Sequence, residues 1–91
     1  MKFVVFVDDN GRYQDKTARY KLGEYEEWET AVRAAQKIVD EYLQSIYKPG
    51  MTTEILLQNY RHFGQDPFIV PEAEQFSAWK YAAARCQQLC Q

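Results

Sequence analysis

Four charged side chains that follow the first apolar segment are the strongest candidates in this chain for binding chemistry. They lie within eight positions of one another: Asp8, Asp9, Arg12 and Asp15. Together with Asn10, the three carboxylates supply oxygen ligands of the kind that Ca²⁺ and Mg²⁺ prefer. We therefore identify residues 8–15 as a candidate binding loop for a small ligand or a divalent metal ion.

The spacing of these residues limits that interpretation. It does not match an EF-hand loop, which needs oxygen ligands at alternate positions, a central Gly and a closing Glu. Neighbouring residues on a strand point to opposite faces, so Asp8 and Asp9 cannot both reach one ion unless the backbone turns. The competing interpretation is that both carboxylates solubilise and cap the end of a strand. No cofactor or metal site is predicted.

The segment Val7-Asp8-Asp9-Asn10 resembles the opening of a response-regulator receiver domain, where such acids hold magnesium beside a phosphorylated aspartate. The rest of the chain argues against that family. Asp40, the residue nearest the separation expected for the phosphorylated aspartate, falls inside a predicted helix. The Lys48-Pro49 dipeptide follows a helix instead of a late strand. A motif counts only when its context agrees.

Other reactive side chains lack partners at spacings that mark a catalytic set. Tyr13, Tyr60 and His62 form a candidate polar and aromatic rim, since Tyr combines an apolar body with a polar tip. His62 is the residue type that most often serves as a general base, but no nucleophile and orienting group accompany it. Cys86 lies late in a predicted helix with few activating charges nearby. No catalytic residue is predicted.

Three strands are predicted around the first apolar run. Residues 3–7, Phe-Val-Val-Phe-Val, are apolar on both faces and are typical of an interior strand. The following Asn10-Gly11 is a turn signal, and residues 19–25 are the preferred antiparallel partner. A tighter hairpin that pairs residues 12–16 is an alternative, but its returning arm holds one large apolar residue. Residues 68–70 form a short strand between two prolines, which indicates an edge position.

Three helices are predicted from apolar spacing and capping residues. Residues 28–47 carry an apolar stripe with 4-3-4 spacing, and the helix ends before Lys48-Pro49. A second helix runs from the N-cap Thr52 to about Phe63, with Gly64 as its C-terminal cap. A third helix begins between residues 72 and 77, with Ser77 as a candidate N-cap. Its expected stripe shares 3-4-3-4 spacing and comprises Phe76, Trp79, Ala83, Cys86 and Cys90.

These elements predict an α+β fold in a single domain, residues 1–91. The chain order is β-β-α-α-β-α, and the sheet order is 2-1-3 with the first strand in the centre. Three amphipathic helices must bury their stripes against this sheet. They either cover both faces, or they cover one face and a second chain covers the other.

Composition excludes several classes of partner. The net charge is −2, and no cluster of Lys and Arg resembles the basic stripe that nucleic acid or an anionic membrane requires. No segment approaches the ~20 apolar residues of a membrane span, and no signal-peptide core precedes Asp8. A cytoplasmic protein with reduced thiols is expected, with Cys86 packed and Cys90 at a frayed helix end.

The layout FVVFVDDN … RYKLGEY … YKPGMT … FGQDPFIVP … FSAWKYA resembles a group of small bacterial proteins of unassigned function. The resemblance spans nearly the whole chain and implies a stand-alone bacterial domain, but it carries no activity, cofactor or site residue. The two-faced first strand, the seven Tyr residues and the missing catalytic set favour a non-enzymatic interaction or regulatory module that self-associates. The alternative is a small ligand- or metal-binding protein, or an enzyme, that uses the acidic 8–15 loop.

Overall fold

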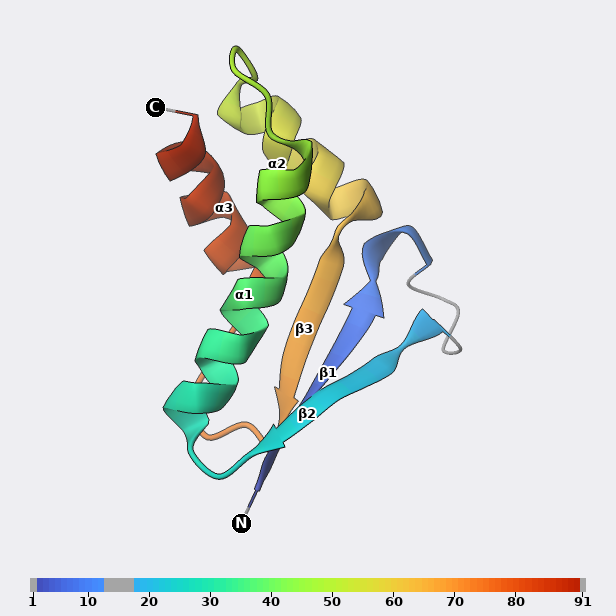
Figure 1. Ribbon diagram of the computed structural model, residues 1–91, viewed down its shortest axis with the longest axis vertical. Coiled ribbons are helices and arrows are strands. Elements are labelled where there is room, and N and C mark those ends of the chain that lie inside the picture. Colours follow the sequence, from blue (N-terminus) through green and yellow to red (C-terminus); the bar gives the residue numbers. More distant parts are fainter. Residues whose placement is uncertain (1, 13–17, 91) are drawn as a thin grey trace.

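The three strands form one antiparallel sheet, and the helices pack against one side of it (Figure 1). The structure is a computed structural model that describes residues 2–12 and 18–90. The strands are β1 (Phe3–Asp9), β2 (Tyr20–Tyr25) and β3 (Gln65–Val70), in the order β2-β1-β3. The predicted α+β class, element order and central position of the first strand are confirmed.

The register of β1 with β2 confirms the longer connection between them. Phe3 pairs with Tyr25 and Val7 pairs with Tyr20, and the register shifts between Val5 and Phe6. Residues 10–12 form η1 (Asn10–Arg12), a single 3-10 turn that ends the strand. The Asn10-Gly11 turn signal therefore stops β1 without folding the chain straight back onto it.

The third strand is longer than the sequence predicts. The prediction placed its start at Phe68, because Asp66-Pro67 is a typical turn dipeptide. In the structure the pairing with β1 continues back through Pro67, opposite Val7, to Gln65, opposite Asp9. Proline is tolerated there because β3 is an edge strand, whose outer side needs no ladder donor.

The helices begin and end close to their predicted limits. They are α1 (Trp28–Ile46), α2 (Thr53–Phe63) and α3 (Ala78–Leu89). The Thr52 side chain accepts a hydrogen bond from the Ile55 N–H at 3.2 Å, and the Ser77 side chain accepts one from the Lys80 N–H at 3.3 Å. Both predicted N-caps are confirmed. None of the helices in the described part of the chain is long and apolar enough to cross a membrane.

The core has two parts, one under the sheet and one among the helices. Val5 and Ile69 pack against Ala31 and Ala35 of α1. Farther along, the three helices enclose a cluster that includes Leu43, Leu56, Tyr60, Ala82 and Cys86.

The predicted stripe of α3 is wrong by one position at Trp79 and Ala83, and correct at Cys86. Its buried residues are Ala78, Ala82 and Cys86, whereas Trp79 is 42% exposed. Small residues at every fourth position let α3 approach α1 and α2 closely, which turns the bulky indole outward. Cys86 is buried as expected, and both cysteines are unpaired.

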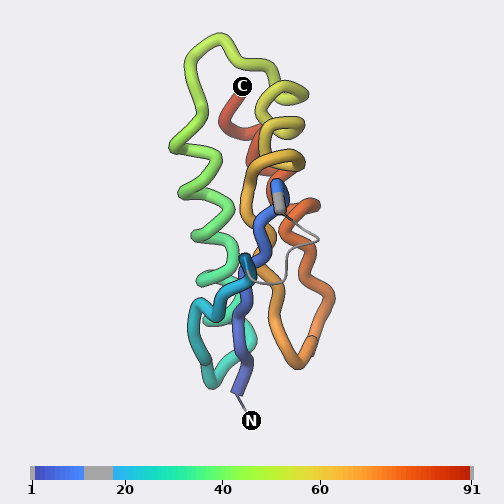
Figure 2. Tube along the Cα trace, turned by 90° about the vertical axis from the view of Figure 1, so that its right-hand side faces the viewer, coloured from blue at the N-terminus to red at the C-terminus, as the bar shows by residue number. Residues whose placement is uncertain are grey.

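The opposite face of the sheet carries apolar side chains that no helix of the described chain covers. Val4 and Phe6 of β1 pair directly with Val70 and Phe68 of β3, so the four side chains share one face. The rings of Phe6 and Phe68 stack at 5.6 Å. We call these four residues the open face. In Figure 2, which presents this side of the molecule, no helix crosses in front of β1.

Candidate functional site

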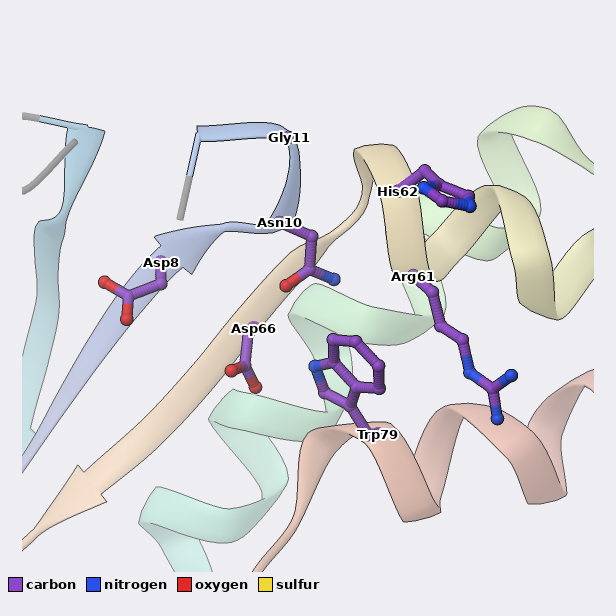
Figure 3. A pocket seen from close by; sticks show the side chains of 7 residues that line it. All are labelled: Asp8, Asn10, Gly11, Arg61, His62, Asp66 and Trp79. Atoms are coloured by element: carbon purple, nitrogen blue, oxygen red, sulfur yellow. The ribbon is translucent and has the colours of Figure 1, made fainter. Parts of the chain in front are cut away.

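A pocket of about 570 Å³ lies where the end of β1 meets the start of β3, the end of α2 and the start of α3. Figure 3 shows the side chains that line it. They come from five elements, β1, η1, α2, β3 and α3: Asp8, Asn10, Gly11, Arg61, His62, Asp66 and Trp79. A volume of this size falls in the usual range of small-molecule sites.

Asn10 fixes the rear of the pocket by joining β1 to the junction of α2 and β3. Its backbone N–H donates to the Gly64 carbonyl at 2.8 Å, and its side-chain amide donates to the Tyr60 carbonyl at 2.9 Å. The Tyr60 carbonyl also accepts the N–H of Gly64 at 2.8 Å. These bonds hold the acidic end of β1 at a set position beside α2.

Asp8 is half of an ion pair that crosses the sheet. The Arg19 guanidinium donates from Nε to Asp8 Oδ1 at 2.6 Å and from Nη2 to Oδ2 at 3.1 Å. The same guanidinium lies 4.9 Å from the centroid of the Phe68 ring. Arg19 therefore reaches from the start of β2 over β1 to β3, and it holds the Asp8 carboxylate in an ion pair with two hydrogen bonds.

Asp66 is the most perturbed acid of the pocket. It pairs with Asp8 across the sheet, so two carboxylates lie on the same face of neighbouring strands. Burial first, and then the negative charge of Asp8, raises the pKa of Asp66 from its usual value of 3.8 to about 6. Asp66 forms no ion pair with any side chain that the structure describes, a set that leaves out residues 12–17. The pocket therefore holds a carboxylate that would gain from a cationic partner.

Replacing Asp66 with Asn is expected to stabilise the protein at neutral pH but not in acid. Between about pH 4 and pH 6 the folded state keeps a proton on Asp66 that the unfolded chain has lost, so stability falls as pH rises. At pH 8, Asp66→Asn should raise the free energy of unfolding by about 1–2 kcal/mol, allowing for solvent screening at this half-buried group. Urea unfolding at pH 4 and pH 8 measures the difference. The exposed Glu41→Gln should show no comparable gain, and an equal gain from Asp66→Asn at both pH values would contradict the assignment.

The residues of the predicted binding loop and rim have different positions in the structure. Asp8 of the loop and His62 of the rim line the pocket. Asp9 does not line it; its Oδ1 accepts the Gly11 N–H at 2.8 Å and caps the turn. Tyr13 and Asp15 lie outside the described residues, as does the side chain of Arg12. The sequence suggested that Asp8 and Asp9 cap the end of the strand, and the structure shows this role for Asp9.

Tyr60 was predicted at a rim, and the structure buries it completely. Its hydroxyl donates to the Gln65 carbonyl at 2.6 Å, and its ring meets Trp79 edge-on at 6.4 Å. Small residues on α3 bring that helix close enough to cover the ring. Tyr60 therefore supports the pocket from the core and does not line it.

Three pocket residues escaped the sequence analysis: Arg61, Asp66 and Trp79. Asp66 was assigned to a turn, and Trp79 was assigned to the buried stripe of α3. Arg61 lies next to His62 at the end of a predicted helix, and no sequence motif marks it as a binding residue. Only the register of β1 with β3, which joins residues far apart in the chain, brings Asp66 to Asp8.

Metal binding and thiol chemistry find little support in the site. Within the described residues, no group of three His, Cys, Asp or Glu side chains is arranged to hold a metal ion. Cys86 is fully buried, and burial raises the pKa of its thiol to about 11. A thiol in that state is a poor nucleophile near neutral pH.

Comparisons with protein-family models, with curated proteins and with solved structures found no match to this chain. The assignment of function therefore depends on the two surfaces described above, the pocket and the open face.

Proposed function

We propose that this chain is a non-enzymatic interaction or regulatory module of the cytoplasm that self-associates through the open face of its sheet. One observation carries the proposal. Along β1, Val5 and Val7 are fully buried under the helices, while the alternating Val4 and Phe6 stay partly exposed although they are equally apolar. An antiparallel sheet with one solvated face normally alternates apolar with polar residues.

The open face has the layout of an interface. Its centre is the stacked pair Phe6 and Phe68, extended by Val4 and by Val70, which is 46% exposed. Charged side chains flank this centre, with Asp8 and Arg19 at one end. Interfaces between proteins commonly have such an apolar centre and a polar rim, and Arg is enriched in them.

A second copy is the partner that the charges of this face favour. Beside the apolar centre, Lys21 and Glu24 of β2 lie opposite Phe6 and Val4 and pair with each other at 3.2 Å. The rim thus carries charges of both signs. A two-fold axis through the centre is able to place the cations of one copy near the anions of the other, as a self-complementary contact requires. Two sheets packed face to face lie ~10 Å apart, a spacing that aromatic and branched side chains fill.

Light scattering coupled to size-exclusion chromatography tests the proposal. At high micromolar concentration the wild type should have twice the chain mass of 10.8 kDa, and Phe68→Glu should remain a monomer because its charge would be buried without a partner. The matched control is Phe63→Glu on α2, since Phe63 is 69% exposed and lies away from the open face. This control should still form dimers. A strictly monomeric wild type would overturn the proposal, as would equal loss of association in both variants when circular dichroism shows both to be folded.

A further inference from the structure

The pocket holds its acidic and its basic side chains at opposite ends. Figure 3 shows Asp8 and Asp66 on one side of Trp79, and Arg61 and His62 on the other side. The acidic end comes from two paired strands and the basic end from the last turn of α2. One ligand that spans the pocket would therefore meet carboxylates at one end and a guanidinium at the other.

The acidic end has one carboxylate that still needs a partner. Asp8 is held by both nitrogens of the Arg19 fork, whereas Asp66 forms no ion pair among the described residues. Asp66 is also half-buried beside a second negative charge. An ammonium group placed there would donate hydrogen bonds to both carboxylates and reduce their mutual repulsion.

The basic end offers the exposed guanidinium of Arg61. Arg61 makes no salt bridge within the described part of the chain, and its guanidinium lies 6.0 Å from the centroid of the Trp79 ring. A planar guanidinium at this position is suited to bind a carboxylate with two parallel hydrogen bonds. A purely cationic ligand would be repelled by Arg61, and a purely anionic ligand would be repelled by Asp66.

The wall between the two ends is apolar and well held. Trp79 stands in the first turn of α3, is 42% exposed, and meets the fully buried Tyr60 edge-on at 6.4 Å. Its indole gives an apolar or aromatic ligand body a surface to cover. We propose that this pocket binds a small zwitterion of the amino-acid class, with its ammonium at Asp66, its carboxylate at Arg61 and its side chain against Trp79.

Three related probes distinguish a zwitterion site from a site for one charge. They are L-phenylalanine, 2-phenylethylamine, which lacks the carboxylate, and 3-phenylpropionate, which lacks the ammonium group. Titration of ¹⁵N-labelled protein at millimolar ligand should shift the amides of Gly11, Arg61 and Asp66 and the indole N–H of Trp79. Phenylalanine should bind about tenfold more tightly than either single-charge probe, because each of those probes lacks one of the two charge-assisted contacts.

Substitutions at the two ends assign each contact. Asp66→Asn should weaken 2-phenylethylamine about tenfold and should bind 3-phenylpropionate at least as tightly as the wild type does, because the repelling carboxylate is gone, and Arg61→Gln should do the reverse. The exposed Glu41→Gln and Arg33→Gln on α1 are charge-matched controls and should change neither.

Repeating the titration in a Val70→Glu background, which should also prevent association, separates this result from the state of association, because Val70 belongs to the open face but lines neither the pocket nor the Arg19–Asp8 ion pair. The assignment is overturned if none of the three probes shifts the pocket signals. It is also overturned if 2-phenylethylamine binds as tightly as phenylalanine, or if the control variants lose as much affinity as Asp66→Asn and Arg61→Gln.

Discussion

Replacing Tyr60 with alanine is expected to lower the free energy of unfolding by about 3–5 kcal/mol, the range measured for large aromatic side chains removed from a core. Tyr60 is the largest fully buried side chain among the described residues, and it contacts both the helical cluster and Trp79. A small domain has about 5–15 kcal/mol of stability in total, so this change would remove a large share of it. Urea unfolding followed by circular dichroism measures the loss.

Two further variants separate the parts of the Tyr60 contribution. Tyr60→Phe removes only the hydroxyl, which leaves the Gln65 carbonyl without its donor, and should cost about 1–3 kcal/mol. Ile55→Ala on the same helix removes an apolar side chain that is 54% exposed and should stay within about 0.5 kcal/mol of the wild type. A loss from Tyr60→Ala no larger than that from Ile55→Ala would contradict the packing described here.

Replacing Gly64 with alanine is expected to cost about 3 kcal/mol, at the upper end of the range for overpacking. A Cβ at this position would lie 2.5 Å from Tyr60 Cδ1 and 2.6 Å from the Tyr60 carbonyl oxygen. The ring is fully buried and the carbonyl already accepts the Gly64 N–H, so neither group has room to move. Gly64 has a φ of −77°, which any residue adopts, and glycine is required for space alone. Thermal unfolding measures the effect.

Gly50 is the matched control for this substitution. Glycine is needed there for its backbone conformation, whereas it is needed at position 64 for lack of space. It has a φ of +94°, and nothing lies within 4 Å of a Cβ built there. Gly50→Ala should cost about 1–2 kcal/mol through backbone strain, and Gly50→Asn should cost less, since Asn tolerates the left-handed region. Asn at position 64 should be at least as harmful as alanine. If Asn rescues position 64 relative to alanine, the close approach to Tyr60 is not the reason for glycine there.

Local sequence signals were sufficient for most of the fold. Five consecutive apolar residues place β1 in the centre of the sheet, and the caps Thr52 and Ser77 begin their helices as expected. These predictions depend on the secondary-structure preferences of residues that are neighbours in sequence. At these positions the tertiary structure agrees with those preferences. The start of β3 was missed because Asp66-Pro67 has a local turn preference, and pairing with β1 outweighs it.

The pocket was less predictable because its residues meet only through tertiary contacts. Asp8 and His62 were singled out from sequence, yet the group that gives the site its polarity is Asp66, which reaches Asp8 through long-range pairing. Trp79 was placed in the core because its spacing fits an apolar stripe. The small residues Ala78 and Ala82 are buried in its place, because they allow α3 to pack closely against the other helices.

The two proposals share one structural origin, the first strand. Its row Val4, Phe6 and Asp8 points away from the helices, paired along β3 with Val70, Phe68 and Asp66. The apolar part of this row forms the open face, and its acidic end forms one side of the pocket. A change at Phe68 therefore tests association, whereas a change at Asp66 tests ligand binding.

Nuclear Overhauser effects between protomers test the central claim most directly. A sample that mixes ¹³C-labelled with unlabelled chains at high micromolar concentration reports only contacts between different copies. Association through the open face predicts intermolecular effects between the rings of Phe6 and Phe68 and the methyl groups of Val4 and Val70. If these signals are missing, or if intermolecular effects arise only from exposed residues of α2 such as Phe63, the open face is not the surface through which this protein associates.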